Sequence, residues 1–280
     1  DFELYIDHVQ GDPFAQPSKI RLRVNHDDSE IPKDIWYNFI RKIALEDFIV
    51  RSVSDAIKKT ATPNKGTGKS GLVYIDAGGQ EVLERTALVI TEDWIEARMQ
   101  VGLPAAGRTI LGNEAIEILC NEIPVIVEQS LNWKNLDQNA CTHFVECVEN
   151  QESIRSQLDH ANLSAFVANV SILPRESGIS DRPLTGENVV EFQSPESLKT
   201  SFVLANSLLN GENVIHGMGI PQGVTLIVGG GYHGKSTLLK SLERCVYPHV
   251  PGDGREYVIT NPNAVKIRAE DGRRIEKVNI

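Results

Sequence analysis

The sequence lacks the features that would place it in a membrane, a fibre or a disulfide scaffold. None of its 280 residues lie in a run of about 20 apolar residues, so no helix is expected to cross a bilayer. It has no collagen-like period and no heptads, and its four cysteines form no Cys-x-x-Cys pair. So few cysteines indicate a reducing compartment. With 41% hydrophobic and 24% charged residues, the composition predicts a soluble globular protein.

The net charge is −10, from 28 basic and 38 acidic side chains, but the basic residues are unevenly distributed. One basic segment carries five cations against Asp55 alone, and polyanions can bind such a patch on an acidic protein. A solvated surface and a nucleic-acid contact are both open at this point. The five cations are Arg51, Lys58, Lys59, Lys65 and Lys69.

Periodicity predicts an α/β protein with two domains, residues 1–185 and 186–280, joined near a Pro- and Gly-rich linker at 174–188. A long helix is expected at 33–59, and a mainly helical region at 112–160 with a break at Pro124. The segment 163–170 fits either a strand or a buried helix. Strands are expected at 2–6, 19–24, 71–77, 86–91, 189–192, 201–204 and 224–228.

The residues from 224 to 242 carry the clearest chemical signal. An apolar strand is followed by Gly-x-x-x-x-Gly-Lys-Ser and then by the start of an amphipathic helix, which is the order that a phosphate-binding P-loop requires. Glycines let successive backbone N–H groups turn toward a phosphate, and the helix N-terminus favours the same negative charge. This pattern predicts a nucleotide site.

Each residue of the loop has an expected role. Lys235 supplies a positive charge for the β- and γ-phosphates of ATP or ADP, Ser236 a hydroxyl for Mg²⁺, and Thr237 a contact to the α-phosphate. Lys235 and Ser236 are the candidate catalytic residues. His233 fits either a phosphate or partner contact or a plain exposed loop histidine. The predicted nucleotide-binding residues are Gly229, Gly230, Gly231, Tyr232, His233, Gly234, Lys235, Ser236 and Thr237.

A second Gly-Lys-Ser occurs at residues 68–70, but its context differs. Pro63 stands where the loop's first glycine is needed, and a helix is expected before it instead of a strand. We therefore interpret residues 65–71 as a flexible basic loop.

The P-loop and its surroundings resemble the predicted ATPases of the ABC class. The resemblance extends over six segments, residues 11–15, 102–108, 172–178, 217–228, 251–256 and 267–273. It implies a family-specific α+β N-terminal domain followed by an ABC-type ATP-binding domain. It also implies a homodimer formed through the ATP domains, and RNA as a partner, because a kinetoplastid mitochondrial member is an RNA-editing accessory. The basic residues of 51–69 are then the expected RNA contacts. A mitochondrial address would follow only for a kinetoplastid member; otherwise a cytoplasmic one is expected.

The sequence departs from the ABC pattern after Lys235. No signature loop, Walker B strand or switch histidine follows, so we expect the ATP domain to be incomplete here, with weak ATP binding and poor hydrolysis by this chain alone. Two alternatives remain, a nucleotide-regulated scaffold without RNA contact and a small-molecule P-loop kinase. A β-hairpin expected around Glu270-Asp271-Gly272-Arg273 suits an ABC domain better than a kinase.

Overall fold

The computed structural model describes residues 1–187, 189–267, 272 and 276–277. The chain divides into two compact units, residues 1–150 (unit 1) and 151–280 (unit 2). The division lies well before the predicted linker at 174–188. Residues 163–168 form a strand that pairs with residues 217–221 of unit 2, so the segment before the linker belongs to the second unit's sheet.

Unit 1 is built on an antiparallel sheet of five strands in the order β1-β2-β5-β3, with β4 also pairing with β5. Both predicted N-terminal strands are confirmed, whereas the central strand β5 was not predicted, although apolar and polar residues alternate along it. The predicted strands at 71–77 and 86–91 are present only as short pieces. The strands are β1 (Glu3–His8), β2 (Ser18–Asn25), β3 (Val73–Tyr74), β4 (Leu88–Ile90) and β5 (Trp94–Val101).

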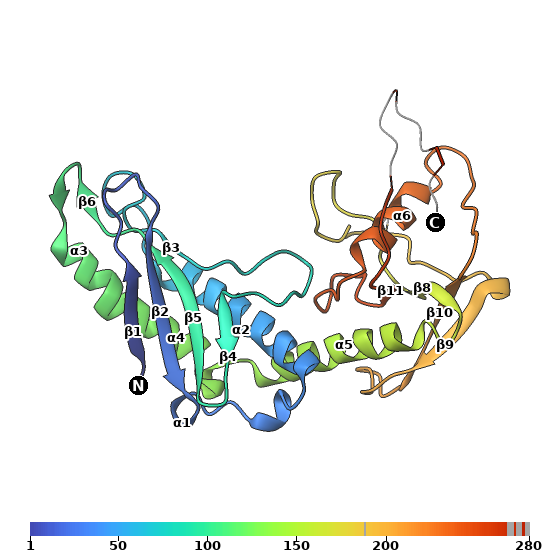
Figure 1. The fold of residues 1–280 in the computed structure, drawn as a ribbon, viewed down its shortest axis with the longest axis horizontal. Coiled ribbons are helices and arrows are strands. Elements are labelled where there is room, and N and C mark those ends of the chain that lie inside the picture. The colour runs from blue at the N-terminus through green and yellow to red at the C-terminus, as the bar shows by residue number, and fades with distance from the viewer. Residues whose placement is uncertain (188, 268–271, 273–275, 278–280) are drawn as a thin grey trace. The chain divides into compact units, whose positions relative to one another are not determined.

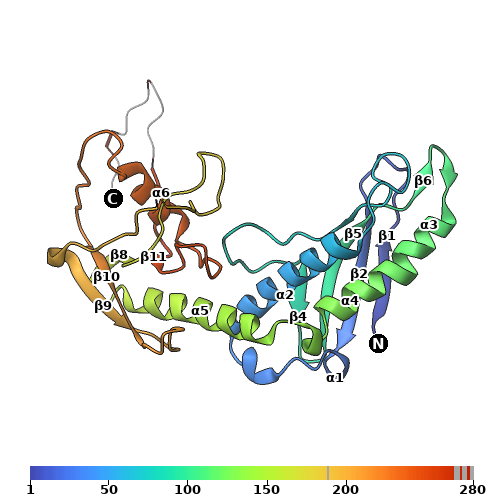
Figure 2. The ribbon, with the colours of Figure 1, turned by 180° about the vertical axis from the view of Figure 1, so that it is seen from behind.

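Helices cover one face of this sheet and leave the other open, as the two opposite views show (Figures 1 and 2). The covered face carries Ile20, Leu22, Ile95 and Val101, all at most 2% exposed, and apolar side chains of the helices complete this core. The helical elements of unit 1 are α1 (His26–Ser29), α2 (Phe39–Thr60), α3 (Gly112–Ile116) and α4 (Ile123–Ser130). Helix α5 (Gln138–Gln157) begins in unit 1 and ends in unit 2.

The predicted helix at 33–59 is present, with its main part beginning later. A 3₁₀ turn at Lys33–Ile35 comes first, and Asn38 then caps α2 by accepting a hydrogen bond from the Arg41 backbone N–H at 2.8 Å. The predicted break of the helix at Pro124 is wrong, because the helix continues through this residue. The chain stays helical from α3 into α4 through a π-helical stretch (Glu117–Glu122), which adapts the backbone just before a residue that cannot donate a hydrogen bond.

Unit 2 contains a four-stranded antiparallel sheet in the order β11-β8-β10-β9. Phe166 on β8 and Phe202 on β9 pack edge to face with their ring centroids 5.1 Å apart, inside a buried cluster with Ile154, Ile215 and Ile259. The elements are β8 (Leu163–Ala168), β9 (Lys199–Val203), β10 (Val214–Pro221), α6 (Lys235–Arg244) and β11 (Val258–Thr260).

Two predicted strands of unit 2 are wrong. Residues 189–192 make backbone hydrogen bonds through Val189, to Gly186, and through Phe192, to Val170 and Ser171, and they form no strand. Residues 224–228 also form no strand, and Val224, Leu226 and Val228 are at least 74% exposed, so these apolar side chains have no packed neighbours in the described part of the chain. The hairpin expected around Glu270 lies outside the described residues.

Strands β10 and β11 pair with β8 in this sheet instead, and neither was predicted. Two glycines interrupt the apolar pattern of β10. A Cβ at Gly217 would lie 2.2 Å from the Val167 carbonyl oxygen of β8, so close strand packing requires glycine there.

Candidate nucleotide-binding loop and open sheet face

The P-loop residues form an exposed turn that leads directly into α6. Gly234 caps the helix with φ +80°, and Gly229 has φ +151°, conformations that favour glycine. Tyr232 is also left-handed, with φ 60°, and its side chain is fully exposed. The loop therefore places the N-terminus of a ten-residue helix at its own end, as a phosphate site requires.

The backbone N–H groups of this loop have no partner among the residues that the structure describes. From Gly229 to Thr237, none donates a hydrogen bond to any group of residues 1–187, 189–267, 272 or 276–277. The Lys235 ammonium donates to the carbonyl oxygens of Gly229 and Gly230, both at 2.5 Å, and so lies across the loop. A charged donor and a row of unused amides within one turn fit the phosphates of a nucleotide.

Two other side chains of the loop, those of His233 and Ser236, lie near the same backbone. The imidazole of His233 lies beside the loop's glycines, and a Cβ at Gly230 would come within 3.1 Å of its Cε1. Ser236 is exposed at the first turn of α6, where its hydroxyl suits a hydrated Mg²⁺. The assignment of all nine residues to a nucleotide site stays a prediction.

A buried polar cluster anchors the other end of α6. The His249 Nδ1–H donates to Asp253 Oδ2 at 2.8 Å, and its Nε2 lies 3.6 Å from the Cys245 sulfur. Arg175 pairs with the same carboxylate oxygen at 2.6 Å. Burial lowers the pKa of His249, but its hydrogen bonds to Asp253 and Cys245 favour the protonated imidazole more strongly and raise that pKa to about 10. The exposed loop thus leads into a helix whose C-terminal end contacts the buried network of Arg175, His249 and Asp253.

The cations predicted to contact RNA do not form one basic surface. Arg51 is paired with Asp47 (2.6 Å) and with the Gly79 carbonyl oxygen, and Lys65 is buried against Glu122 (2.9 Å). Lys58 pairs with Asp55 on the surface. Arg51 and Lys65 thus already pair with groups of the protein itself, and the assignment of the five cations to RNA stays a prediction.

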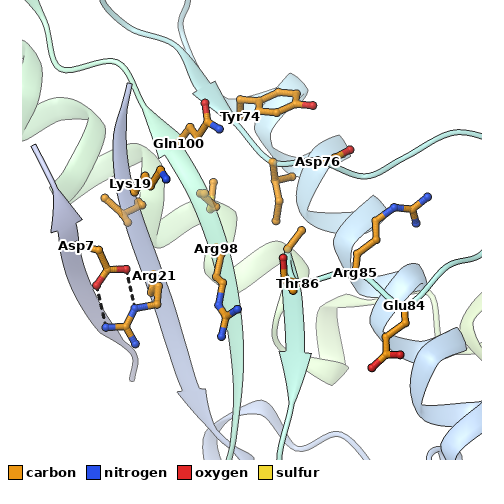
Figure 3. Close-up of a pocket in the computed structure, with 14 residues that line it drawn as sticks. Asp7, Lys19, Arg21, Tyr74, Asp76, Glu84, Arg85, Thr86, Arg98 and Gln100 are labelled. Carbon is orange, nitrogen blue, oxygen red and sulfur yellow. Dashed lines mark hydrogen bonds and ion pairs between the residues drawn. The ribbon is translucent and has the colours of Figure 1, made fainter. Parts of the chain in front are cut away.

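The structure assembles another charged surface that the sequence did not reveal. Glu96 of β5 is 1% exposed and lies among three guanidinium groups, those of Arg21 (3.0 Å), Arg23 (2.8 Å) and Arg98 (2.9 Å). Burial raises the pKa of Glu96, but these hydrogen bonds outweigh it and lower the pKa. A neighbouring pocket of about 590 Å³ includes Lys19, Arg21, Tyr74, Arg98 and Gln100 (Figure 3).

Two kinds of site are not found in the described residues. None of their helices is both long and apolar enough to span a membrane. Among the same residues, no three His, Cys, Asp or Glu side chains are grouped as metal ligands would be. Mg²⁺ would therefore depend on Ser236, water and the phosphates themselves.

Comparison with known proteins finds a family match for the sequence of each unit. The family described as "ATPase of the ABC class N-terminal" matches residues 1–134, and the ABC ATPase family described as "P-loop domain" matches residues 137–280. An uncharacterised protein of Methanocaldococcus jannaschii is 29% identical over 156 residues, which cover 54% of this chain and 33% of that protein. The chain thus spans about a third of the length of this relative.

Proposed function

The chain belongs to the ABC-class ATPase family, with its α+β N-terminal domain followed by a P-loop domain, and from this we propose that it binds ATP with Mg²⁺ at Gly229–Thr237. The observation that supports the site most directly is the run of unused backbone N–H groups beside Lys235. Buried amides without partners are costly, whereas amides of an exposed loop that have no partner can donate to phosphate oxygens. The family supports nucleotide binding, and the loop supports its location.

The proposed roles follow from the side chains. Lys235 leaves the carbonyl oxygens of Gly229 and Gly230 and neutralises charge on the terminal phosphates, while the N-terminus of α6 orients them. Ser236 holds Mg²⁺, which supplies neutralisation of the developing negative charge when it is bound. Hydrolysis by the whole protein, with closure of a homodimer around the nucleotide, follows the ABC resemblance. The result is a nucleotide-driven switch that is not a transporter.

RNA is the proposed macromolecular partner of this switch. The resemblance to the kinetoplastid ATPase supports it, as does the surplus of arginine on the open sheet face of unit 1. For a kinetoplastid member, the family resemblance supports a link of this switch to mitochondrial RNA editing. A nucleotide-regulated scaffold and a small-molecule kinase remain the alternatives.

The test of the nucleotide site is a matched pair of lysine variants. Lys235→Ala should weaken Mg-ATP binding by roughly 10- to 100-fold in titration calorimetry, because a hydrogen bond to a charged group is worth about 1.5–3 kcal/mol. Lys69→Ala, in the other Gly-Lys-Ser, should leave the affinity unchanged. Equal affinities of Lys235→Ala and the natural protein would refute the site.

Two further measurements separate the alternatives. Transfer of labelled γ-phosphate to a metabolite would identify a kinase. Binding of ATP without RNA binding, at any salt concentration, would favour the scaffold.

A further inference from the structure

The uncovered side of the unit 1 sheet, which we call the open face, gathers basic and aromatic side chains from four strands. Strand register puts Lys19, Gln100 and Tyr74 in one cross-strand row, and Tyr5, Arg21 and Arg98 in the next. A third row contains Arg23 and Glu96, and Trp94 lies at the end of β5. Residues that alternate with these form the buried core, so the open face is set by the same alternation.

Glu96 holds the arginines of this face in place. One buried carboxylate orients three guanidinium groups, and each of these has further N–H donors that Glu96 cannot accept. Asp7 pairs with one side of the Arg21 guanidinium at 2.7 Å. Among the described residues Arg98 pairs with Glu96 alone, and its side chain is 43% exposed. The network therefore presents a preorganised set of donors to solvent, with Arg98 the most available.

Aromatic rings are part of the same network. The Arg23 guanidinium carbon lies 4.2 Å from the centroid of Trp94, and those of Arg21 and Arg23 lie 4.8 and 5.2 Å from that of Tyr5. Such stacked planes of arginine and aromatic rings offer π-faces on which bases can stack. Tyr74 adds an exposed ring beside Gln100.

The pocket next to Arg98 has the size of a nucleotide site. It opens where the sheet edge is interrupted, since β3 pairs with one end of β5 and β4 with the other. Figure 3 shows Lys19, Gln100, Arg98 and Thr86 around it, with Arg85 and Glu84 on the far side. The Lys19 ammonium makes no hydrogen bond or ion pair within the part of the chain that the structure describes.

Charge distribution points to an anionic partner at this place. Unit 1 has 15 basic and 24 acidic side chains, and yet on this face Lys19, Arg21, Arg23 and Arg98 outnumber the carboxylates Glu3, Asp7 and Glu96. A sheet face that carries stacked rings suits unpaired bases better than it suits the grooves of a duplex. An acidic peptide would use the cations but would leave the aromatic faces unused.

We propose that the open face binds single-stranded nucleic acid, with phosphates at Lys19 and Arg98, bases on Trp94 and Tyr74, and one nucleotide in the adjoining pocket. This proposal rests on the proposed RNA partner and assigns it a surface. It moves that surface away from the segment 51–69 that the sequence predicted.

The test compares two double variants of equal charge change in the full chain. Lys19→Gln with Arg98→Gln removes the proposed phosphate contacts, and Lys58→Gln with Lys59→Gln removes two cations of α2. Binding of labelled U20 RNA is measured by fluorescence anisotropy over a salt series. We expect the first variant to lose tenfold or more in affinity and about 1.4 in the log–log salt slope, and the second to match the natural protein.

A second readout does not depend on how the variants fold. Ultraviolet crosslinking of the natural protein to the same RNA should label the peptide that contains Trp94, and not the peptide that contains Lys58 and Lys59. Single-stranded DNA of the same length, added as competitor, distinguishes a requirement for the ribose hydroxyl from binding through phosphates and bases.

The outcomes are separable from those for the ATP site. RNA binding that is lost in the α2 variant and kept in the Lys19/Arg98 variant would overturn the surface and keep the partner. No binding of RNA or DNA would overturn both, while Mg-ATP titration of the same sample still tests Lys235. Tighter binding of polyglutamate than of RNA would overturn the proposal in favour of an acidic protein partner.

Discussion

The two Gly-Lys-Ser loops of this chain share a tripeptide but differ in whether their backbone N–H groups are already hydrogen-bonded. In residues 65–71, the backbone N–H groups of Thr67, Lys69 and Gly71 donate to the carbonyl oxygens of Ala105, Pro13 and Gly102, each at 2.8 Å. In the P-loop, the N–H groups from Gly229 to Thr237 donate to nothing that the structure describes. A phosphate can be bound only by amides that the protein has not already used.

The comparison also concerns side chains. Lys65 and Ser70 are turned into unit 1, where Lys65 pairs with Glu122 and the Ser70 hydroxyl donates to the Thr67 carbonyl oxygen at 2.6 Å. Lys235 and Ser236 stand at the surface at the start of a helix. We therefore expect substitutions in the first loop to change stability and substitutions in the second to change nucleotide binding.

The largest effect is expected at Lys65. Lys65→Ala would leave the Glu122 carboxylate, whose side chain is 7% exposed, with the Thr62 backbone N–H as its one remaining hydrogen-bond donor among the described residues. Removing one partner of a buried ion pair costs about 3–5 kcal/mol, and urea unfolding should show a loss of that size. The control is Lys59→Ala on exposed α2 surface, which should change little. A loss below about 1 kcal/mol for Lys65→Ala would show that its pairing is not structural.

Glycine substitutions should have the next largest effects, on stability beside the first loop and on nucleotide binding in the P-loop. A Cβ at Gly102 would lie 1.8 Å from the Lys69 carbonyl oxygen, which is backbone and cannot move away cheaply, so Gly102→Ala should cost about 3 kcal/mol. A Cβ at Gly231 meets nothing within 4 Å, and Gly231→Ala should leave thermal unfolding unchanged. The same variant should weaken Mg-ATP binding, because the new Cβ occupies space at the amides. Equal unfolding temperatures for the two variants would contradict the comparison.

The serines provide a third and smaller contrast. Ser70→Ala removes a buried hydroxyl that also accepts from the Ala105 backbone N–H at 3.1 Å, and should cost about 1–3 kcal/mol in unfolding free energy without affecting ATP. Ser236→Ala should leave stability unchanged and reduce the gain in ATP affinity that Mg²⁺ provides. Calorimetry with and without Mg²⁺ measures both, and an unchanged Mg²⁺ effect would remove Ser236 from the metal site.

The stability of unit 2, which carries the P-loop, should depend on pH through His249. The pKa of His249 is raised from 6.5 to about 10, so its stabilisation is complete below about pH 6.5 and is lost as the pH rises through 10. The free energy of unfolding of unit 2 should fall by roughly 1 kcal/mol per pH unit across this window. Hydrogen exchange of α6 should report the fall, which His249→Gln should abolish. A slope that persists in this variant would assign the dependence to other groups.

Local pattern predicted much of this protein. Strands β1 and β2, helix α2 and the start of α6 each depend on a period or a turn within a short stretch of sequence. The family assignment and the predicted nucleotide loop follow from the same local order of residues, since a P-loop needs only glycines, Lys235 and a helix start next to one another.

What the sequence could not determine depends on pairing between distant segments. Arg21 and Glu96 are 75 residues apart, and only the register of β2 against β5 brings them to one face. In the same way, Lys65 became structural because the helical turn that carries Glu122 lies against its loop. Periodicity distinguishes inside from outside along one element, but which charges meet is decided by tertiary packing, because a side chain's pairing depends on neighbours that its own sequence does not contain.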